Sequence, residues 1–135
     1  DDHGKLRYQY GSIVATGAAI AQNDTVLLFR LPPGRKRILP NLSRISTSAW
    51  GAGRTVDIGH KAYLKSNTPY TEEALDVDAF VDGMDVSAAV NAAALSTVLK
   101  YDMYSVTEVD IYATILGGTL PADGTLAVLL AYLYE

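Results

Sequence analysis

The sequence predicts an all-β protein, an antiparallel β-sandwich or jelly roll, and three observations carry this prediction. Short segments with the residue pattern of strands recur along most of the chain. Turn-forming residues separate them, as at Pro32-Pro33-Gly34, Gly51-Ala52-Gly53 and residues 118–124. The 135 residues are 49% hydrophobic, so one domain of this length can bury a proper core. Many short strands divided by turns are typical of β-sandwiches.

Three strand regions are expected between residues 25 and 59. Residues 25–31 form a short apolar run, which indicates a buried strand that stops at the Pro-Pro-Gly turn. Residues 38–47 form a second region, in which Pro40 cannot donate a backbone hydrogen bond and so indicates a sheet edge or a break. Residues 55–59 alternate polar and apolar side chains with period two, as a half-buried strand does.

The C-terminal part contains the clearest strand pattern. Apolar and polar side chains alternate over residues 109–115, which places one face of this strand in the core. Residues 126–133 are apolar on both faces, and their Tyr content and preceding turn favour a central strand, covered on both sides, over a buried helix. A further strand is expected near residues 79–86.

Residues 1–24 are expected to form an extended N-terminal arm outside a single domain of residues 25–135. They are rich in Gly and Ala, and few large side chains could anchor them. The arm is either a frayed terminus or a segment that docks on a partner, and Tyr8 and Tyr10 favour docking.

Two further segments lack a strand pattern. Residues 64–78 carry Pro, Asn, Thr and four carboxylates, and we expect a long surface loop there. Residues 87–99 are rich in Ala behind a possible Ser cap, and helix and loop remain equal alternatives for this segment.

The residue types that most enzymes use are scarce. The chain has no cysteine, which excludes disulfides, thiolate metal sites and cysteine nucleophiles. Of the two histidines, His3 lies in the expected arm, and His60 is expected on the surface at a strand end. Gly51-Ala52-Gly53 lacks the further residues of a phosphate-binding loop. We therefore expect no enzymatic activity and no cofactor.

The sequence also disfavours membrane and nucleic-acid partners. The first seven residues lack the apolar run of a signal peptide, and no apolar stretch reaches the length of about 18 residues that crosses a bilayer. The net charge of −4 opposes non-specific binding to nucleic acid. However, residues 1–65 carry ten Lys and Arg against four Asp and Glu, whereas residues 66–135 carry one against eleven. Such a bipolar chain can pair one of its faces with the opposite face of a second copy.

The candidate site residues are all candidates for contacts with partner proteins. The basic run after the Pro-Pro-Gly turn is either a solvated hairpin tip or an anchor for an acidic surface. The single tryptophan is either part of the core or an interface anchor. The full set is Tyr8, Tyr10, Arg35, Lys36, Arg37, Trp50, Glu72, Glu73, Asp76 and Asp78. A calcium site at Asp76, Asp78, Asp82 and Asp85 is a minor alternative, because their spacing does not match the EF-hand loop.

Four segments resemble, in their order, segments of small head proteins of tailed bacteriophages. These segments are Leu28-Phe29-Arg30-Leu31-Pro32-Pro33-Gly34, residues 50–59, Asp85-Val86-Ser87-Ala88-Ala89 and residues 111–124. In that group an apolar strand ends in Leu-Pro-x-Gly, and a turn of the Gly-Gly-Thr-Leu-Pro-Ala type precedes the last strand. The group also has a Gly-Ala-Gly-Thr turn, which Arg54 interrupts in this chain.

The resemblance implies a decoration (cement) protein of jelly-roll type. Such a domain binds the major capsid protein on the outer capsid lattice, reinforces that lattice and often forms a homotrimer. The resemblance therefore implies a place on the capsid surface of the virion, after synthesis in the host cytoplasm. A phage tail module or a receptor- or carbohydrate-binding sandwich is the alternative, but it should carry exposed aromatic residues, and residues 64–78 offer only Tyr70.

Overall fold

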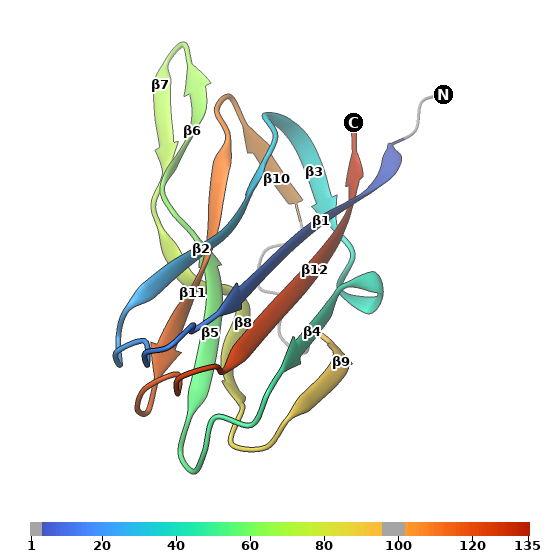
Figure 1. Cartoon of the computed structure of the whole chain (residues 1–135). Helices are drawn as coiled ribbons and strands as arrows, with labels where there is room; N and C mark the ends of the chain where they lie inside the picture. Colours follow the sequence, from blue (N-terminus) through green and yellow to red (C-terminus); the bar gives the residue numbers. More distant parts are fainter. Residues whose placement is uncertain (1–3, 96–101) are drawn as a thin grey trace.

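The computed structural model describes residues 4–95 and 102–135, which form an antiparallel β-sandwich with a projecting hairpin (Figure 1). This described part contains twelve strands and a single turn of 3₁₀ helix, η1 (Pro40–Leu42). The expectation of an all-β antiparallel sandwich is therefore confirmed. The described residues include no helix that is long and apolar enough to cross a membrane.

The larger sheet has six strands, with β12 at its centre. β12 pairs with β1 along one side, and its other side pairs with β3 near the C-terminus and with β4 further back. β10 and β9 complete the sheet next to β3 and β4. The strands are β1 (Lys5–Val14), β3 (Gly34–Ile38), β4 (Arg44–Thr47), β9 (Val90–Ala94), β10 (Asp102–Ser105) and β12 (Thr125–Tyr134).

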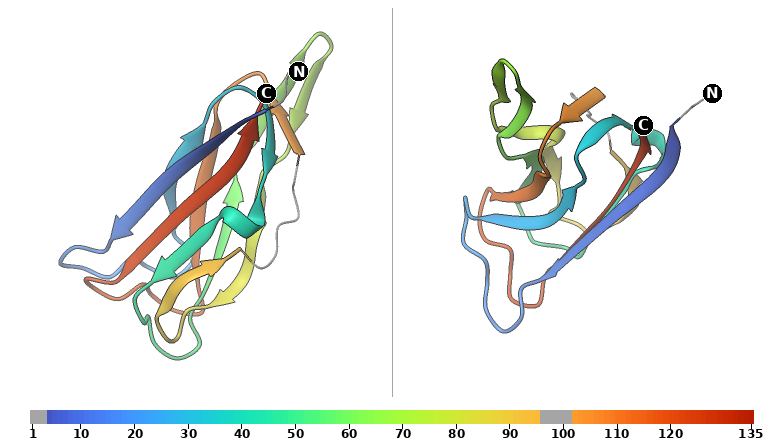
Figure 2. Two further views of the ribbon diagram at one scale, coloured as in Figure 1. Left: turned by 90° about the vertical axis from the view of Figure 1, so that its right-hand side faces the viewer. Right: turned by 90° about the horizontal axis from the view of Figure 1, so that it is seen from above.

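The second sheet has four strands in the order β2-β11-β5-β8. They are β2 (Thr25–Leu31), β5 (Thr55–His60), β8 (Asp76–Asp85) and β11 (Val109–Leu116). The remaining strands, β6 (Tyr63–Asn67) and β7 (Tyr70–Glu73), form a separate hairpin. In Figure 1 this hairpin projects at the end of the sandwich where both termini lie, and Figure 2 shows the two sheets from the side and from above.

The core lies between the two sheets and receives alternate residues of the central strands. Leu126, Val128 and Leu130 of β12 are buried. Ile111 and Ile115 of β11 are fully buried in the same cluster. Each such side chain stabilises the fold by about 1.5–3 kcal/mol relative to an exposed one. The alternation expected for residues 109–115 is thus confirmed, and the ten-residue strand β12 confirms the strand expected at residues 126–133.

The N-terminal segment is extended, as expected, but it pairs with its own domain. All ten residues of β1 lie opposite residues of β12. Gly11 fits where β1 crosses β2, because a Cβ atom there would overlap the backbone of Leu28. Residues 5–14 are therefore an edge strand of the sandwich, which corrects the expectation of an arm outside the domain. Residues 5–10 do alternate polar side chains with Leu6, Tyr8 and Tyr10, and this strand signal was outweighed by the Gly- and Ala-rich composition of residues 1–24 as a whole.

The structure decides three further segments. The region 38–47 is broken by η1 at Pro40, one of the two outcomes that this proline indicated. The expected loop 64–78 contains the β6–β7 hairpin and the start of β8. Residues 90–94 form β9 against β4 rather than a helix, and residues 96–99 of the 87–99 segment lie outside the described residues. Pairing with a preformed sheet edge here outweighs the helix propensity of alanine, which is weak in a short segment.

Candidate interaction surfaces

Apolar side chains of β1 and β12 form a stripe on the outer face of the six-stranded sheet. The buried, even-numbered residues of β12 face the core, so its odd-numbered residues face outwards. Leu6 lies opposite Leu133, and Tyr10 opposite Leu129, and residues directly opposite share a face. The large β1 residues of this face are exposed by 48 to 63%. We call this set the tyrosine stripe: Leu6, Tyr8, Tyr10, Val14, Leu129 and Leu133.

Three arginines border the tyrosine stripe on the same face. Arg44 lies opposite Leu129, and Arg37 lies opposite Leu133. Arg35, two residues before Arg37, also faces outwards and stacks over the ring of Tyr104 at 5.9 Å. The set Arg35, Arg37 and Arg44 is called the cationic rim.

The cationic rim is incompletely neutralised within the chain. Arg37 pairs with Asp102, with Nε 3.2 Å from Oδ1. Arg44 donates to the backbone carbonyls of Asn41 and Ser43 at 2.6 and 2.9 Å. Neither Arg35 nor Arg44 has a carboxylate partner among the described residues. The outer face of this sheet therefore combines apolar area with net positive charge.

The position of Lys36 corrects the expectation that all three residues of the basic run Arg35-Lys36-Arg37 reach outwards. Its side chain is fully buried, because β3 alternates and Lys36 points to the inner side. The ammonium donates to Pro32 O and Gly34 O at 2.7 Å each and to Ser105 Oγ at 3.0 Å. Burial lowers the pKa of Lys36 to about 8. Lys36 thus holds together the turn that ends β2, and it is not part of a solvated hairpin tip.

An acidic patch lies on the other sheet of the sandwich. It comprises Asp57 of β5 and the β8 residues Asp76, Asp78 and Asp82. A hydrogen bond with Asp76, followed by burial and repulsion from the other carboxylates, raises the pKa of Asp78. Burial raises the pKa of Asp57, although its Oδ1 accepts a hydrogen bond from Gly83 N at 2.6 Å. No lysine or arginine of the described residues forms an ion pair with these four carboxylates.

Gly59 allows β8 to fold over β5 and so brings the acidic patch together. A Cβ atom at position 59 would overlap the backbone of Asp76 and Val77. The β5–β8 register is irregular on both sides of Ile58, as this close approach requires. On the same outer face, Leu27 of β2 lies opposite Tyr112 and is exposed by 45%. The patch is therefore acidic with an apolar neighbour.

The acidic patch does not have the arrangement of a metal site. Across residues 4–95 and 102–135, no group of three or more His, Cys, Asp or Glu side chains is placed to hold a metal ion. Asp85 turns away to accept a hydrogen bond from Ser87 N at 2.9 Å, which lowers the pKa of Asp85. The structure gives the calcium alternative no support.

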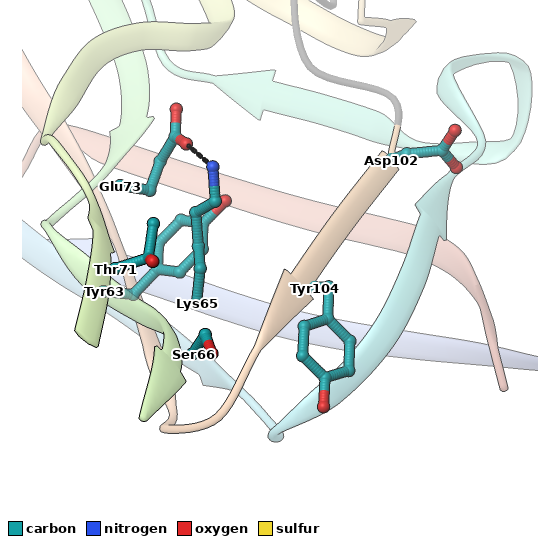
Figure 3. A pocket seen from close by; sticks show the side chains of 7 residues that line it. All are labelled: Tyr63, Lys65, Ser66, Thr71, Glu73, Asp102 and Tyr104. Atoms are coloured by element: carbon teal, nitrogen blue, oxygen red, sulfur yellow. Dashed lines mark hydrogen bonds and ion pairs between the residues drawn. The ribbon is translucent and has the colours of Figure 1, made fainter. Parts of the chain in front are cut away.

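A small cavity of about 290 Å³ lies between the β6–β7 hairpin and β10 (Figure 3). On the hairpin side of it, Lys65 Nζ of β6 lies 3.1 Å from Glu73 Oε1 of β7. Burial, with a smaller contribution from Glu73, raises the pKa of Tyr63 to about 12. The cavity offers two tyrosine rings, hydroxyls and charges from its lining residues Tyr63, Lys65, Ser66, Thr71, Glu73, Asp102 and Tyr104.

Two aromatic candidates belong to the core. Trp50 is buried, and its Nε1 donates to Thr125 O at 3.2 Å, so the core alternative holds for this residue. His60 ends β5, as expected, but it is buried rather than on the surface. Its ring lies against Tyr63 at 5.1 Å and Phe80 at 6.3 Å. Both rings are thus structural.

The structure distributes the remaining candidates over three regions. Tyr8 and Tyr10 lie on the tyrosine stripe, beside Arg35 and Arg37 of its rim. Asp76 and Asp78 lie in the acidic patch on the other sheet. Glu72 accepts a hydrogen bond from Tyr70 at 3.2 Å on the hairpin, and Glu73 pairs with Lys65. The sequence did not identify Leu129 and Leu133 as candidates. Residues 126–133 are apolar on both faces, which indicated a strand covered on both sides, whereas the outer face of β12 is only partly covered.

Chains of three phage capsid structures have a similar arrangement of strands. The match to a chain of the Ralstonia phage GP4 capsid has a TM-score of 0.66 at 19% identity and covers 100% of this chain and 88% of that chain. The chain has the fold of a phage capsid component. A chain of the Cyanophage Pam1 capsid gives a TM-score of 0.61 at 14% identity, covering 100% and 89%. A chain of the Helicobacter pylori bacteriophage KHP30 capsid gives 0.52 at 12% identity, covering 98% and 90%.

At these low identities the likeness to phage capsid chains is one of fold. It extends over the whole sandwich, including β1, because the matches cover nearly all of this chain. No family model matches the sequence. No curated protein matches it either.

Proposed function

We propose that this protein is a structural virion protein that decorates a phage capsid, where it binds the outer lattice and stabilises it. The tyrosine stripe carries the proposal. A folded monomer rarely exposes a contiguous apolar face of this kind, and such faces mark contacts with other proteins. The fold shared with phage capsid chains supports an assembly in which that face is covered.

The proposed partners are the major capsid protein and further copies of this chain, arranged as a homotrimer. The proposed place is the capsid surface of the virion, after synthesis in the host cytoplasm. The role is structural rather than catalytic, and it involves no cofactor, nucleic acid or membrane. The cationic rim supports partner binding, because charge at the border of an apolar contact sets register and association rate.

Co-sedimentation with capsids prepared without this protein tests the proposal. Purified wild-type chain should pellet with the capsids and raise the temperature at which they release their genome. The double variant Tyr8→Ser, Tyr10→Ser should bind at least about tenfold more weakly, since exposed aromatic side chains often carry interface energy. Tyr70→Ser is the matched control, because Tyr70 is an exposed tyrosine of the hairpin. A wild-type chain that stays in the supernatant contradicts the proposal.

The cavity between the hairpin and β10 supports a second candidate, a carbohydrate-binding module. Tyrosine rings can pack on the apolar face of a sugar while hydroxyls and carboxylates bind its hydroxyl groups. Titration with the glycans of the host cell surface tests this function, with perturbation of Tyr104 as the readout. Binding that survives Tyr104→Ala, or no binding at millimolar glycan, contradicts it.

A further inference from the structure

We propose that the tyrosine stripe and cationic rim of one copy bind the acidic patch of a second copy, together with exposed Leu27 on the same face. This inference rests on the proposed function and deepens it, because it identifies the chain that covers the stripe as a second copy. Changes in the stripe then weaken capsid binding by separating copies that bind the lattice together. It also goes beyond the sequence-based expectation, in which a basic tip at residues 35–37 faced an acidic loop. Lys36 is buried, so only Arg35 and Arg37 of that tip reach outwards, and they do so as part of the cationic rim.

The two surfaces are complementary in charge. The rim presents Arg35 and Arg44 without carboxylate partners in the described part of the chain. The patch gathers four carboxylates that form no ion pair within the described residues, and Lys61 Nζ lies over the nearby Tyr112 ring at 4.2 Å. The hydrogen bond with Asp76 raises the pKa of Asp78 most, and burial and then repulsion from the other carboxylates add to it. A guanidinium from a neighbour would relieve that repulsion, and arginine suits such contacts because it binds carboxylates with two donors at once.

The two surfaces are also complementary in apolar area. On the first surface the residues lie in rows across the sheet. Tyr10, Leu129 and Arg44 form one row, and Leu6, Leu133 and Arg37 form another, with Tyr8 between the two rows. On the second surface, exposed Leu27 lies opposite Tyr112, on the same outer face as the carboxylates. Apolar contact must supply most of the affinity, because exposed ion pairs contribute about 0–1 kcal/mol each. The charges then select the partner and fix its register.

The position of the surfaces in the fold makes the contact intermolecular. The stripe lies on the outer face of the six-stranded sheet, whereas Asp57 and β8 belong to the four-stranded sheet on the other side of the core. One chain therefore cannot join its own two surfaces. A contact between two different surfaces is heterologous, and repetition of one rotation closes it into a ring. A ring of three copies agrees with the proposed homotrimer.

Four variants test this contact in the isolated protein, without any capsid. The first carries Arg35→Glu and Arg44→Glu, and the second carries Asp78→Lys and Asp82→Lys. The third combines all four changes, so that both surfaces reverse their charge and become complementary again. The control carries Lys5→Glu and Arg30→Glu, which match the first variant in charge but belong to neither surface. Circular dichroism establishes that each variant folds.

Sedimentation equilibrium gives the oligomer size and its dissociation constant. We expect the wild type and the control to form the same closed oligomer. The first two variants should have dissociation constants at least about tenfold higher, and the combined variant should regain the wild-type oligomer size. A wild type that stays monomeric at all concentrations overturns the inference, and so does an oligomer that neither reversal weakens. Capsid co-sedimentation of the same wild-type protein remains an independent test, so a monomer that still binds capsids overturns this contact and leaves the proposed function standing.

Discussion

Replacing Lys36 by methionine should remove a pH dependence of stability that the wild-type chain carries between about pH 8 and 10.5. Burial lowers the pKa of Lys36 from 10.5 to about 8 in the folded protein. In this window the unfolded chain therefore binds more protons than the folded one, so the free energy of unfolding rises as the pH rises. Below about pH 8 both states are protonated, and the cost of burying the charge is fully present.

The difference between the two pKa values corresponds to about 3 kcal/mol. That figure is an upper limit, because the ammonium keeps three hydrogen bonds that favour its charged form. The methionine side chain has a similar length without the charge, and it would leave the carbonyls of Pro32 and Gly34 without this donor. The two effects oppose each other at pH 7, so the slope against pH is the informative quantity.

Urea unfolding between pH 7 and 10 measures this slope, and Trp50, the single tryptophan of the chain, is a suitable probe because it is buried. Lys5→Met is the control, since Lys5 is exposed on β1 and its replacement should leave the slope unchanged. Parallel stability curves for the wild type and Lys36→Met would refute the assignment of Lys36 as a buried cation.

Two further changes test how β8 and β1 are held. Gly59→Ala should destabilise the chain by about 2 kcal/mol or more, because the new Cβ atom overlaps the backbone of β8. An unfolding midpoint equal to that of the wild type would show that β8 does not fold over β5 at this position. Deleting residues 1–14 should lower the unfolding midpoint sharply, because β1 covers one side of β12 along ten residues. If the backbone amides of β12 still exchange hydrogen as slowly as in the full chain, the segment is a dispensable arm.

The strands that the sequence predicted correctly are those with a strong local pattern. Val109, Ile111 and Ile115 alternate with polar neighbours, and a strand that is half buried between two others produces that pattern. Pro40 marked the end of β3 because proline lacks the donor that a ladder needs. These signals depend on a few neighbouring residues, so they can be read without the fold.

The features that the sequence did not reveal depend on contacts between distant segments. Residues 90–94 form a strand because β4 offers an open edge, and nothing local to these alanines specifies that edge. Lys36 is buried because Ser105, 69 positions away, and the turn of β2 supply its acceptors. The acidic patch forms because β8 passes close over Gly59, and this is a property of backbone packing rather than of the spacing of charges in the sequence. The sequence indicated the two tyrosines of the tyrosine stripe as candidates, but it did not indicate the residues that β12 contributes.

Electron cryo-microscopy of the virion that contains this chain tests the central claim most directly. A capsid decoration protein should appear as sandwich-shaped density repeated over the whole outer lattice, with the tyrosine stripe covered by a neighbouring chain. Density for this chain at a single vertex or in the tail, or a stripe that faces solvent in every copy, would contradict the claim.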